Sequence, residues 1–181
     1  MTLHTDLTTL LTDAGIVDVD VDEAVADERV RSAAYQRIVA VAVASPNRNG
    51  DLAIVATILR DPQELTSKTA VVALVDEIAR QATDPASFEH WAAELLPALD
   101  HLKAEGHRAF IRHRVRDWSL YLSVAEGQVP TAAELAEITD WMQRLLAEET
   151  TSAPVLDLLA ESGSTKKIRN IAKSRIGLRA D

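Results

Sequence analysis

The sequence predicts an all-helical protein, and three observations support this class. Apolar residues recur every three or four positions along most of the 181 residues, as they do on one face of a helix. Helix start and stop signals separate these periodic segments. Only residues 16–22 alternate with the two-residue period of a strand, but they carry three aspartates and have no partner strand elsewhere. We therefore expect a loop there, and a single all-helical domain over residues 1–181.

Four helices are predicted between the N-terminus and residue 81. Gly15 is placed to end the first with a left-handed C-cap. The second ends in a β-branched run for which a strand is the alternative, but the intervening alanines favour a helix. Pro, Asn and Gly in residues 45–50 predict a turn. The four helices are expected over residues 3–14, 23–44, 51–60 and 61–81.

The helix over residues 61–81 has the clearest start. Asp61 is expected as its N-cap, Pro62 at its first helical position, and Glu64 to reach back to the cap. Its apolar residues cover more than one stripe, so we expect neighbouring helices on two sides. These residues are Leu65, Val71, Val72, Leu74, Val75, Ile78, Ala79 and Ala82.

Five further helices follow, which makes about nine in all. Pro97 is expected to kink the first of them, because proline removes one backbone hydrogen bond and crowds the preceding turn. Gly106 is expected to end that helix, and Gly177 to end the last. Thr131 and Glu134 have the T-x-x-E spacing of a capping box. The five helices are expected over residues 86–104, 107–125, 131–149, 153–161 and 165–176.

No sequence motif points to catalysis. Cysteine is absent, and the chain has no nucleophile elbow, glycine-rich phosphate loop or H-E-x-x-H pattern. Asp18, Asp20 and Asp22 resemble the start of a calcium-binding loop. However, Glu23 and Arg29 stand where that loop requires glycine and glutamate. We expect these aspartates to form an acidic linker that caps helices.

The tryptophans and histidines also have structural explanations. Trp91, Trp118 and Trp141 each fall on an apolar helical face, so we expect them in the core. His90 and His101 share a helix face, but no third ligand at metal spacing lies nearby. We therefore expect neither a metal nor a cofactor.

The sequence also indicates a compartment. The first 15 residues lack the basic and apolar regions of a signal peptide, and no apolar run approaches the roughly 18 residues of a membrane span. We expect a cytoplasmic protein with no membrane partner.

Four predicted helices share a short internal pattern. The matching segments begin at Val30, Thr66, Ile111 and Ile168, at offsets of 36, 45 and 57 residues. Each has a small residue or valine four positions later, which lets adjacent helices approach while the flanking aliphatic residues fill the seam.

This pattern resembles the second helix of HEAT and armadillo-type repeats, whose form is D-P-x-x-x-V-R-x-x-A-x-x-A-L. The matching residues are Asp61, Pro62, Ala70, Ala73 and Leu74 in one copy, Val30, Arg31 and Ala34 in another, and Ile168, Arg169 and Ala172 in a third. Only the copy at Asp61 has the aspartate, and it carries Thr66 and Ser67 in place of valine and arginine. The resemblance implies a curved HEAT-like helical stack, in which an Asp and Arg ladder links neighbouring repeats. A globular helical bundle is the alternative.

Charge is distributed unevenly along the chain. The net charge is −9, yet residues 164–181 hold six cations against one aspartate, or +5, which leaves −14 for residues 1–163. Four arginines also lie close together on one predicted helix, where they form a basic stripe. The candidate binding residues are Arg108, Arg112, Arg114 and Arg116 in the stripe, and Lys166, Lys167, Arg169 and Lys173 in the tail.

Both sets have a structural alternative. In an acidic protein the arginines of the stripe are expected to pair with Asp and Glu of adjacent helices, and the tail is expected to be the solvated face of a last helix.

The sequence favours a non-enzymatic interaction module that presents one face of a helical stack to another protein. One alternative is a nucleic-acid-associated protein resembling HEAT-like DNA-alkylation-repair glycosylases. Those enzymes use a carboxylate, nearby tryptophans and a basic surface, and similar residue types occur here in Asp117, Trp118, Trp91 and the arginine stripe. The acidic balance opposes duplex binding unless the stripe and tail combine. A second alternative is an immunity-like or antitoxin-like protein whose acidic body binds a basic effector.

Overall fold

The computed structural model describes residues 2–180, with side chains as far as residue 178, and this part of the chain contains helices and no strand. The all-helical class is therefore confirmed. The elements are α1 (Leu3–Asp13), α2 (Val21–Ala26), α3 (Glu28–Ala44), α4 (Asp51–Ile58), α5 (Glu64–Gln81), α6 (Pro85–Leu95), the 3₁₀ helix η1 (Leu96–His101), α7 (Glu105–Ala125), α8 (Ala132–Glu137), α9 (Asp140–Glu149), α10 (Ala153–Ser162) and α11 (Lys166–Ala180).

The chain divides into two compact units. Unit 1 comprises Met1–Gln81 and His90–Arg112, and unit 2 comprises Ala82–Glu89 and His113–Asp181. Helices α6 and α7 therefore each contribute residues to both units.

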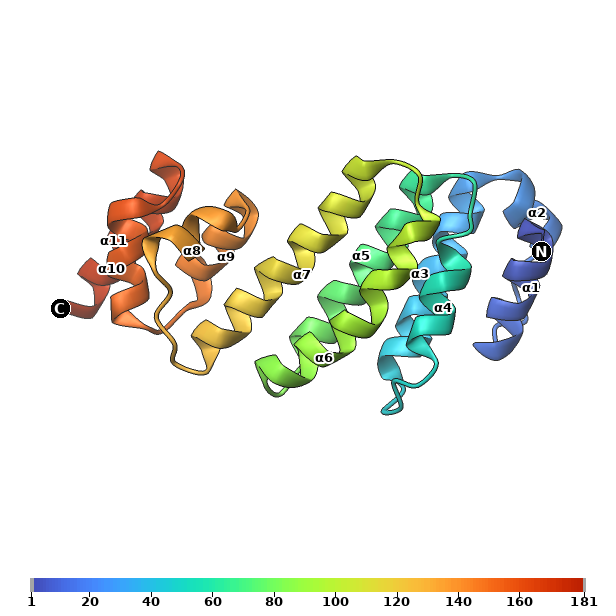
Figure 1. Ribbon diagram of the computed structural model, residues 1–181, viewed down its shortest axis with the longest axis horizontal. Coiled ribbons are helices and arrows are strands. Elements are labelled where there is room, and N and C mark those ends of the chain that lie inside the picture. Colours follow the sequence, from blue (N-terminus) through green and yellow to red (C-terminus); the bar gives the residue numbers. More distant parts are fainter. Residues whose placement is uncertain (1, 181) are drawn as a thin grey trace. The chain divides into compact units, whose positions relative to one another are not determined.

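The core of unit 1 is built around α5, which packs against α3 and α4 (Figure 1). Its residues Val71, Leu74, Val75 and Ala79 are fully buried, as expected for a helix with neighbours on two sides. Leu65 is the exception at 59% exposed. It lies in the first turn of α5, where the neighbouring helices leave its side chain mostly uncovered. Hydrophobic periodicity identifies the apolar face of a helix but not how far along the helix that face is covered.

A buried ion pair fixes the start of α5. The Asp61 side chain is fully buried and accepts hydrogen bonds from Arg31 Nε at 2.7 Å and the Tyr35 hydroxyl at 2.9 Å. Arg31 also donates through Nη1 to the carbonyl oxygens of Ala24 and Val25 at the end of α2. Burial, together with the neighbouring Asp61 charge, raises the pKa of Tyr35, so its hydroxyl stays protonated and donates. One cluster thus joins α2, α3 and α5.

The expected capping arrangement of α5 is wrong. The helix begins at Glu64, and Glu64 does not reach back to the backbone N–H of Asp61, because that N–H donates to the carbonyl oxygen of Ile58 at 3.0 Å. The Asp61 carboxylate does accept from the Gln63 N–H at 2.8 Å, just ahead of the helix. Instead, the Glu64 carboxylate accepts hydrogen bonds from the backbone N–H of Lys103 at 2.6 Å and of Ala104 at 3.1 Å. Glu64 therefore satisfies backbone donors just before α7, which local sequence does not reveal.

His107 completes this contact, with Nδ1 at 3.1 Å from the Glu64 carboxylate. The two backbone N–H groups, and secondarily His107, lower the pKa of Glu64.

Several helix ends agree with the sequence. Gly15 has a φ of +68°, which glycine adopts without the strain that a Cβ brings. Asp20 accepts from the Glu23 N–H as the N-cap of α2. Thr131 and Glu134 form the expected capping box at the start of α8.

Other helix ends differ from the prediction. The helix expected over residues 23–44 is divided at Asp27, whose carboxylate caps α3 by accepting from the Arg29 N–H at 2.7 Å. Pro97 does more than kink α6: the helix stops at Leu95 and continues as η1. Gly106 was expected to end the preceding helix but lies inside α7, and Gly177 was expected to end the last helix but lies inside α11. The break at Asp27, together with a second one between α8 and α9, explains why the described residues form eleven α-helices where about nine were expected.

Unit 2 has its own core, in which α10 and α11 lie side by side (Figure 1). The helix expected over residues 131–149 is divided here into α8 and α9, with Ile138 and Thr139 between them. The fully buried residues of this core include Leu135, Met142, Val155, Leu156, Leu159 and Ala172.

We predict that Asp61→Ala lowers the free energy of unfolding by about 3–5 kcal/mol, because it leaves the buried Arg31 guanidinium without its partner. Urea denaturation measures the change. The control is Asp18→Ala, which removes the exposed Arg37 pair and should have a far smaller effect. The double variant Arg31→Met with Asp61→Leu should recover most of the loss. Equal losses in Asp61→Ala and Asp18→Ala would contradict the prediction.

A second prediction concerns pH. Because the folded pKa of Glu64 is lowered, its contribution to stability is complete above the ordinary glutamate pKa of 4.5 and is lost as pH falls through the lower folded value. The amide proton shifts of Lys103 and Ala104, followed by NMR, should titrate with a midpoint below 4.5. This titration should disappear in Glu64→Gln. A midpoint at or above the ordinary value would show that the contact is absent in solution.

Candidate binding surface

Helix α11 carries the highest density of positive charge in the sequence. Its 15 residues include six Lys and Arg and no Asp or Glu. The helix is capped by Thr165, whose Oγ1 accepts from the Ile168 N–H at 3.2 Å. Ile168 and Ala172 are buried, and the helix packs against α9 and α10. The remaining faces of α11 carry its charge.

Three lysines of α11 are exposed and carry free charge. Lys166, Lys167 and Lys173 form no ion pair with any carboxylate that the structure describes. Lys166 and Lys167 also occupy the first turn, where the partial positive charge of a helix N-terminus disfavours cations by about 0.3–1 kcal/mol each. Helix stability therefore does not explain these two lysines.

The two arginines next to them have structural contacts. Arg169 Nη1 donates to the carbonyl oxygen of Gly163 at 2.5 Å, at the end of α10. Arg175 Nη1 donates to the carbonyl oxygen of Ala147 at 3.0 Å, in the last turn of α9. Because a Cβ at Gly163 would lie only 2.6 Å from the carbonyl oxygen of Leu159, this tight connection between α10 and α11 requires glycine. Of the four tail candidates, Arg169 thus has a structural role and the three lysines remain available.

A shallow groove of about 570 Å³ runs along α11. Its lining combines cationic, polar and apolar side chains, with Ile171 half-buried between them. The lining residues are Lys166, Lys167, Asn170, Ile171, Ser174 and Arg175. The groove therefore offers both charge and an apolar contact to a partner.

The arginine stripe of α7 is largely engaged within the protein. In unit 1, Arg108 pairs with Glu105 at 2.7 Å and donates to the carbonyl oxygen of Leu102 at 2.6 Å. Arg112 pairs with the same Glu105 at 3.1 Å. Both arginines thus find an acidic partner, but on their own helix, whereas an adjacent helix was expected.

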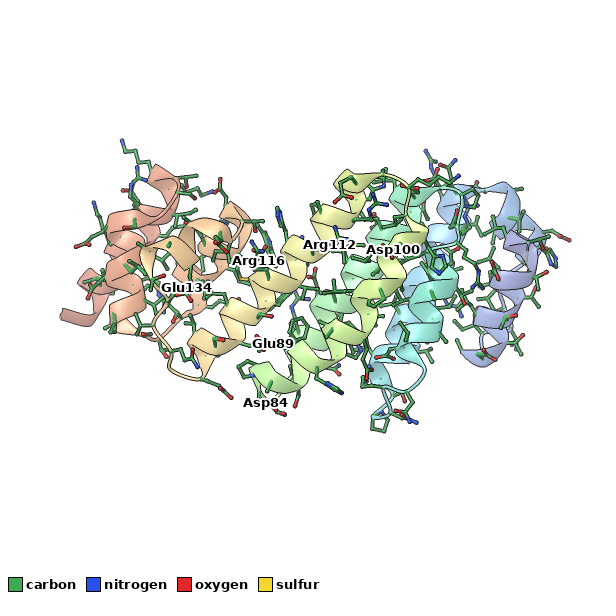
Figure 2. All side chains as sticks on the ribbon, in the orientation of Figure 1. Asp84, Glu89, Asp100, Arg112, Arg116 and Glu134 are labelled. Carbon is green, nitrogen blue, oxygen red and sulfur yellow. The ribbon has the colours of Figure 1, made fainter. Side chains whose placement is uncertain are left out.

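In unit 2, the guanidinium of Arg114 lies over the ring of Trp141, at 3.9 Å from its centroid. Arg116 reaches Glu137 of α8 at 3.4 Å, and both of these side chains are more than half exposed. Figure 2 labels Arg112 and Arg116 on α7, the first in unit 1 and the second in unit 2. The four arginines are therefore shared between two units and do not form one unpaired surface.

Asp117, the carboxylate of the glycosylase alternative, has a structural environment. It is 1% exposed and accepts from Thr139 N at 2.9 Å and from Thr139 Oγ1 at 2.5 Å. Burial raises the pKa of Asp117, and the Thr139 hydrogen bonds oppose that shift. Thr139 in turn caps α9 by accepting from Met142 N. Asp117 thus holds the break between α8 and α9, which explains why the predicted single helix is divided there.

The tryptophans have different environments. Trp118 is buried in unit 2. Trp91 is 9% exposed in unit 1 and donates from Nε1 to the buried Asp51 at 3.0 Å. Trp141 is 39% exposed, so the expectation that all three tryptophans lie in the core is wrong for this one. Its ring centroid lies 5.9 Å from that of Trp118, in an edge-on arrangement. Periodicity placed Trp141 on an apolar face, but it does not show how completely neighbouring helices cover that face.

No group of three or more His, Asp or Glu residues in the described part of the chain is arranged to hold a metal ion. None of the described helices is both long enough and apolar enough to cross a bilayer. Comparisons with protein families, with curated proteins and with solved structures give no match for this chain.

We predict that Asp117→Ala lowers the free energy of unfolding by about 1–3 kcal/mol, because the half-buried Thr139 N–H and hydroxyl lose their buried acceptor. Urea denaturation again provides the measurement. Asp157→Ala, at an exposed position of α10, is the matched control and should leave stability nearly unchanged. If Asp117→Ala were as stable as this control, the structural role of Asp117 would be refuted.

Proposed function

We propose that the protein is a non-enzymatic interaction module, and that the exposed face of α11 binds an acidic segment of a partner protein. The observation that carries this proposal is the set of three exposed lysines, Lys166, Lys167 and Lys173, on a helix without acidic residues. Attraction to a complementary charge raises association rates and selects partners of the opposite sign.

An acidic protein segment fits this face better than a nucleic acid does. Residues 1–163 carry a net charge of −14. A nucleic acid that extends past α11 would come within about 8 Å of this acidic part of the protein, the distance over which charges still repel each other at physiological salt. The arginine stripe that a nucleic acid would need is engaged with Glu105, Glu137 and Trp141. The groove also contains Ile171, which offers an apolar contact that a phosphate backbone does not use.

We further propose a HEAT-like helical stack as the architecture. The pair between Arg31 and Asp61 joins the arginine of one repeat copy to the aspartate of the next, as the Asp and Arg ladder does in HEAT and armadillo-type repeats. This contact supports the resemblance independently of the sequence pattern. A globular bundle remains the alternative.

Charge reversal tests the binding face. The probes are a fluorescent glutamate-rich peptide of about 20 residues, long enough to cover α11, and a DNA duplex of about 20 base pairs. Anisotropy in about 0.15 M salt should show binding of the peptide and little binding of the duplex. The double variant Lys166→Glu with Lys167→Glu should weaken peptide binding at least about tenfold. Its fold should persist, because glutamate is favoured in a first helical turn.

The matched control is Arg29→Glu with Lys103→Glu, which makes the same change in net charge at exposed positions of unit 1. It should bind the peptide nearly as well as the unmodified protein. An equal loss in this control would show that overall charge, rather than α11, governs binding, and would overturn the assignment of the face. Tighter binding of the duplex than of the peptide would favour the nucleic-acid alternative.

A further inference from the structure

We infer that the partner segment is an acidic amphipathic helix that lies lengthwise along α11. This inference rests on the proposed function, since it specifies what the exposed face of α11 binds. It is drawn from the order of apolar and charged residues along that face.

An apolar seam follows one stripe of α11. Ile171 and Leu178 are seven residues apart, with Ser174 between them and Lys167 one turn earlier. At 3.6 residues per turn, these four positions fall within about 60° of one another around the helix axis. Leu178 is 76% exposed and Ile171 half-buried, so the seam is open to a partner. Seven-residue spacing of apolar residues is the repeat of two helices that pack along their length.

A helical partner fits this seam better than an extended one. Ile171 and Leu178 are separated by about 10.5 Å along the helix axis, whereas side chains on one face of a strand repeat every 6.6–6.8 Å or so. The backbone N–H and C=O groups in the middle of α11 are used within the helix, so an extended peptide would gain no backbone hydrogen bonds there. A helical partner satisfies its own backbone groups and needs only side-chain contacts.

The charges beside the seam specify an acidic partner. Around the helix axis, Lys167 lies on the seam itself, and the exposed Lys166 and Lys173 lie about 110–130° from its centre, on the side away from the buried Ile168 and Ala172. Lys167 therefore faces the partner directly and favours Glu or Asp opposite it, while the two lysines farther round the helix add to the positive field that attracts an acidic segment. The partner therefore carries apolar residues at seven-residue spacing, with carboxylates on the same face where it meets Lys167.

Two peptides of identical composition test this inference. Both contain leucine and glutamate in about 20 residues; in one the leucines recur at the seven-residue spacing of a helical seam, and in the other their order is scrambled. The ordered peptide should bind the full chain at least about tenfold more tightly than the scrambled one. Its far-UV circular dichroism should show a gain of helix on binding.

Side-chain variants locate the contact. Leu178→Ser should weaken binding of the ordered peptide about tenfold, and it should leave the fold intact because Leu178 is 76% exposed. Val129→Ser, which removes an exposed apolar side chain from a loop of unit 2, is the matched control and should have no effect. Weaker binding of the ordered peptide in Leu178→Ser, with unchanged binding in Val129→Ser, would support the seam as the contact surface.

The outcomes separate this inference from the proposed function. Equal binding of the two peptides, with loss in Lys166→Glu and Lys167→Glu, would overturn the helical partner and leave the acidic-partner function standing. No binding of either peptide would overturn both. Preferential binding of the DNA duplex, or of anionic phospholipid vesicles, would show that the charge of α11 serves another class of partner and would also overturn the inference.

Discussion

The buried ion pair between Arg31 and Asp61 is the constraint on which the arrangement of unit 1 depends. A charge removed from water is tolerated only when it is paired and hydrogen-bonded, and both side chains are almost fully buried. Arg31 meets this requirement only where α2, α3 and the start of α5 converge, because its other hydrogen bonds go to Ala24 and Val25. The pair therefore fixes where α5 begins, and the apolar face of α5 then supplies the core.

The same principle governs helix ends elsewhere in the protein. Each helix leaves backbone groups unsatisfied at its ends, and charged side chains from outside the helix satisfy several of them. Glu64 does so before α7, Asp117 holds Thr139 before α9, and Arg48 donates to the carbonyl oxygens of Ala42 and Val43 at the end of α3. Many charged residues that resemble a binding site in the sequence are thus structural.

The lysines of α11 stand apart from this structural use of charge. Arg169 and Arg175 turn inward to carbonyl oxygens, while Lys166, Lys167 and Lys173 remain exposed beside a half-buried apolar residue. Two of these lysines oppose the helix dipole. Protein interfaces commonly have an apolar core surrounded by a polar rim. Exposed lysines beside an apolar side chain, which do not stabilise their own helix, fit that description. This contrast within a single helix separates the lysines that we propose as binding residues from the arginines that support the fold.

The sequence by itself determined the features that depend on residues close to one another along the chain. It predicted the helical class, the left-handed Gly15 and the capping box of Thr131 and Glu134, because each follows from contacts within one turn. It also identified the basic tail. Only the tertiary structure decided that Glu64 caps α7, that Asp117 divides α8 from α9, and that the four arginines of α7 are engaged. The contacts of Glu64, Asp117, Arg114 and Arg116 depend on partners that lie far along the chain, such as Lys103, 39 residues from Glu64, and no local pattern encodes their proximity.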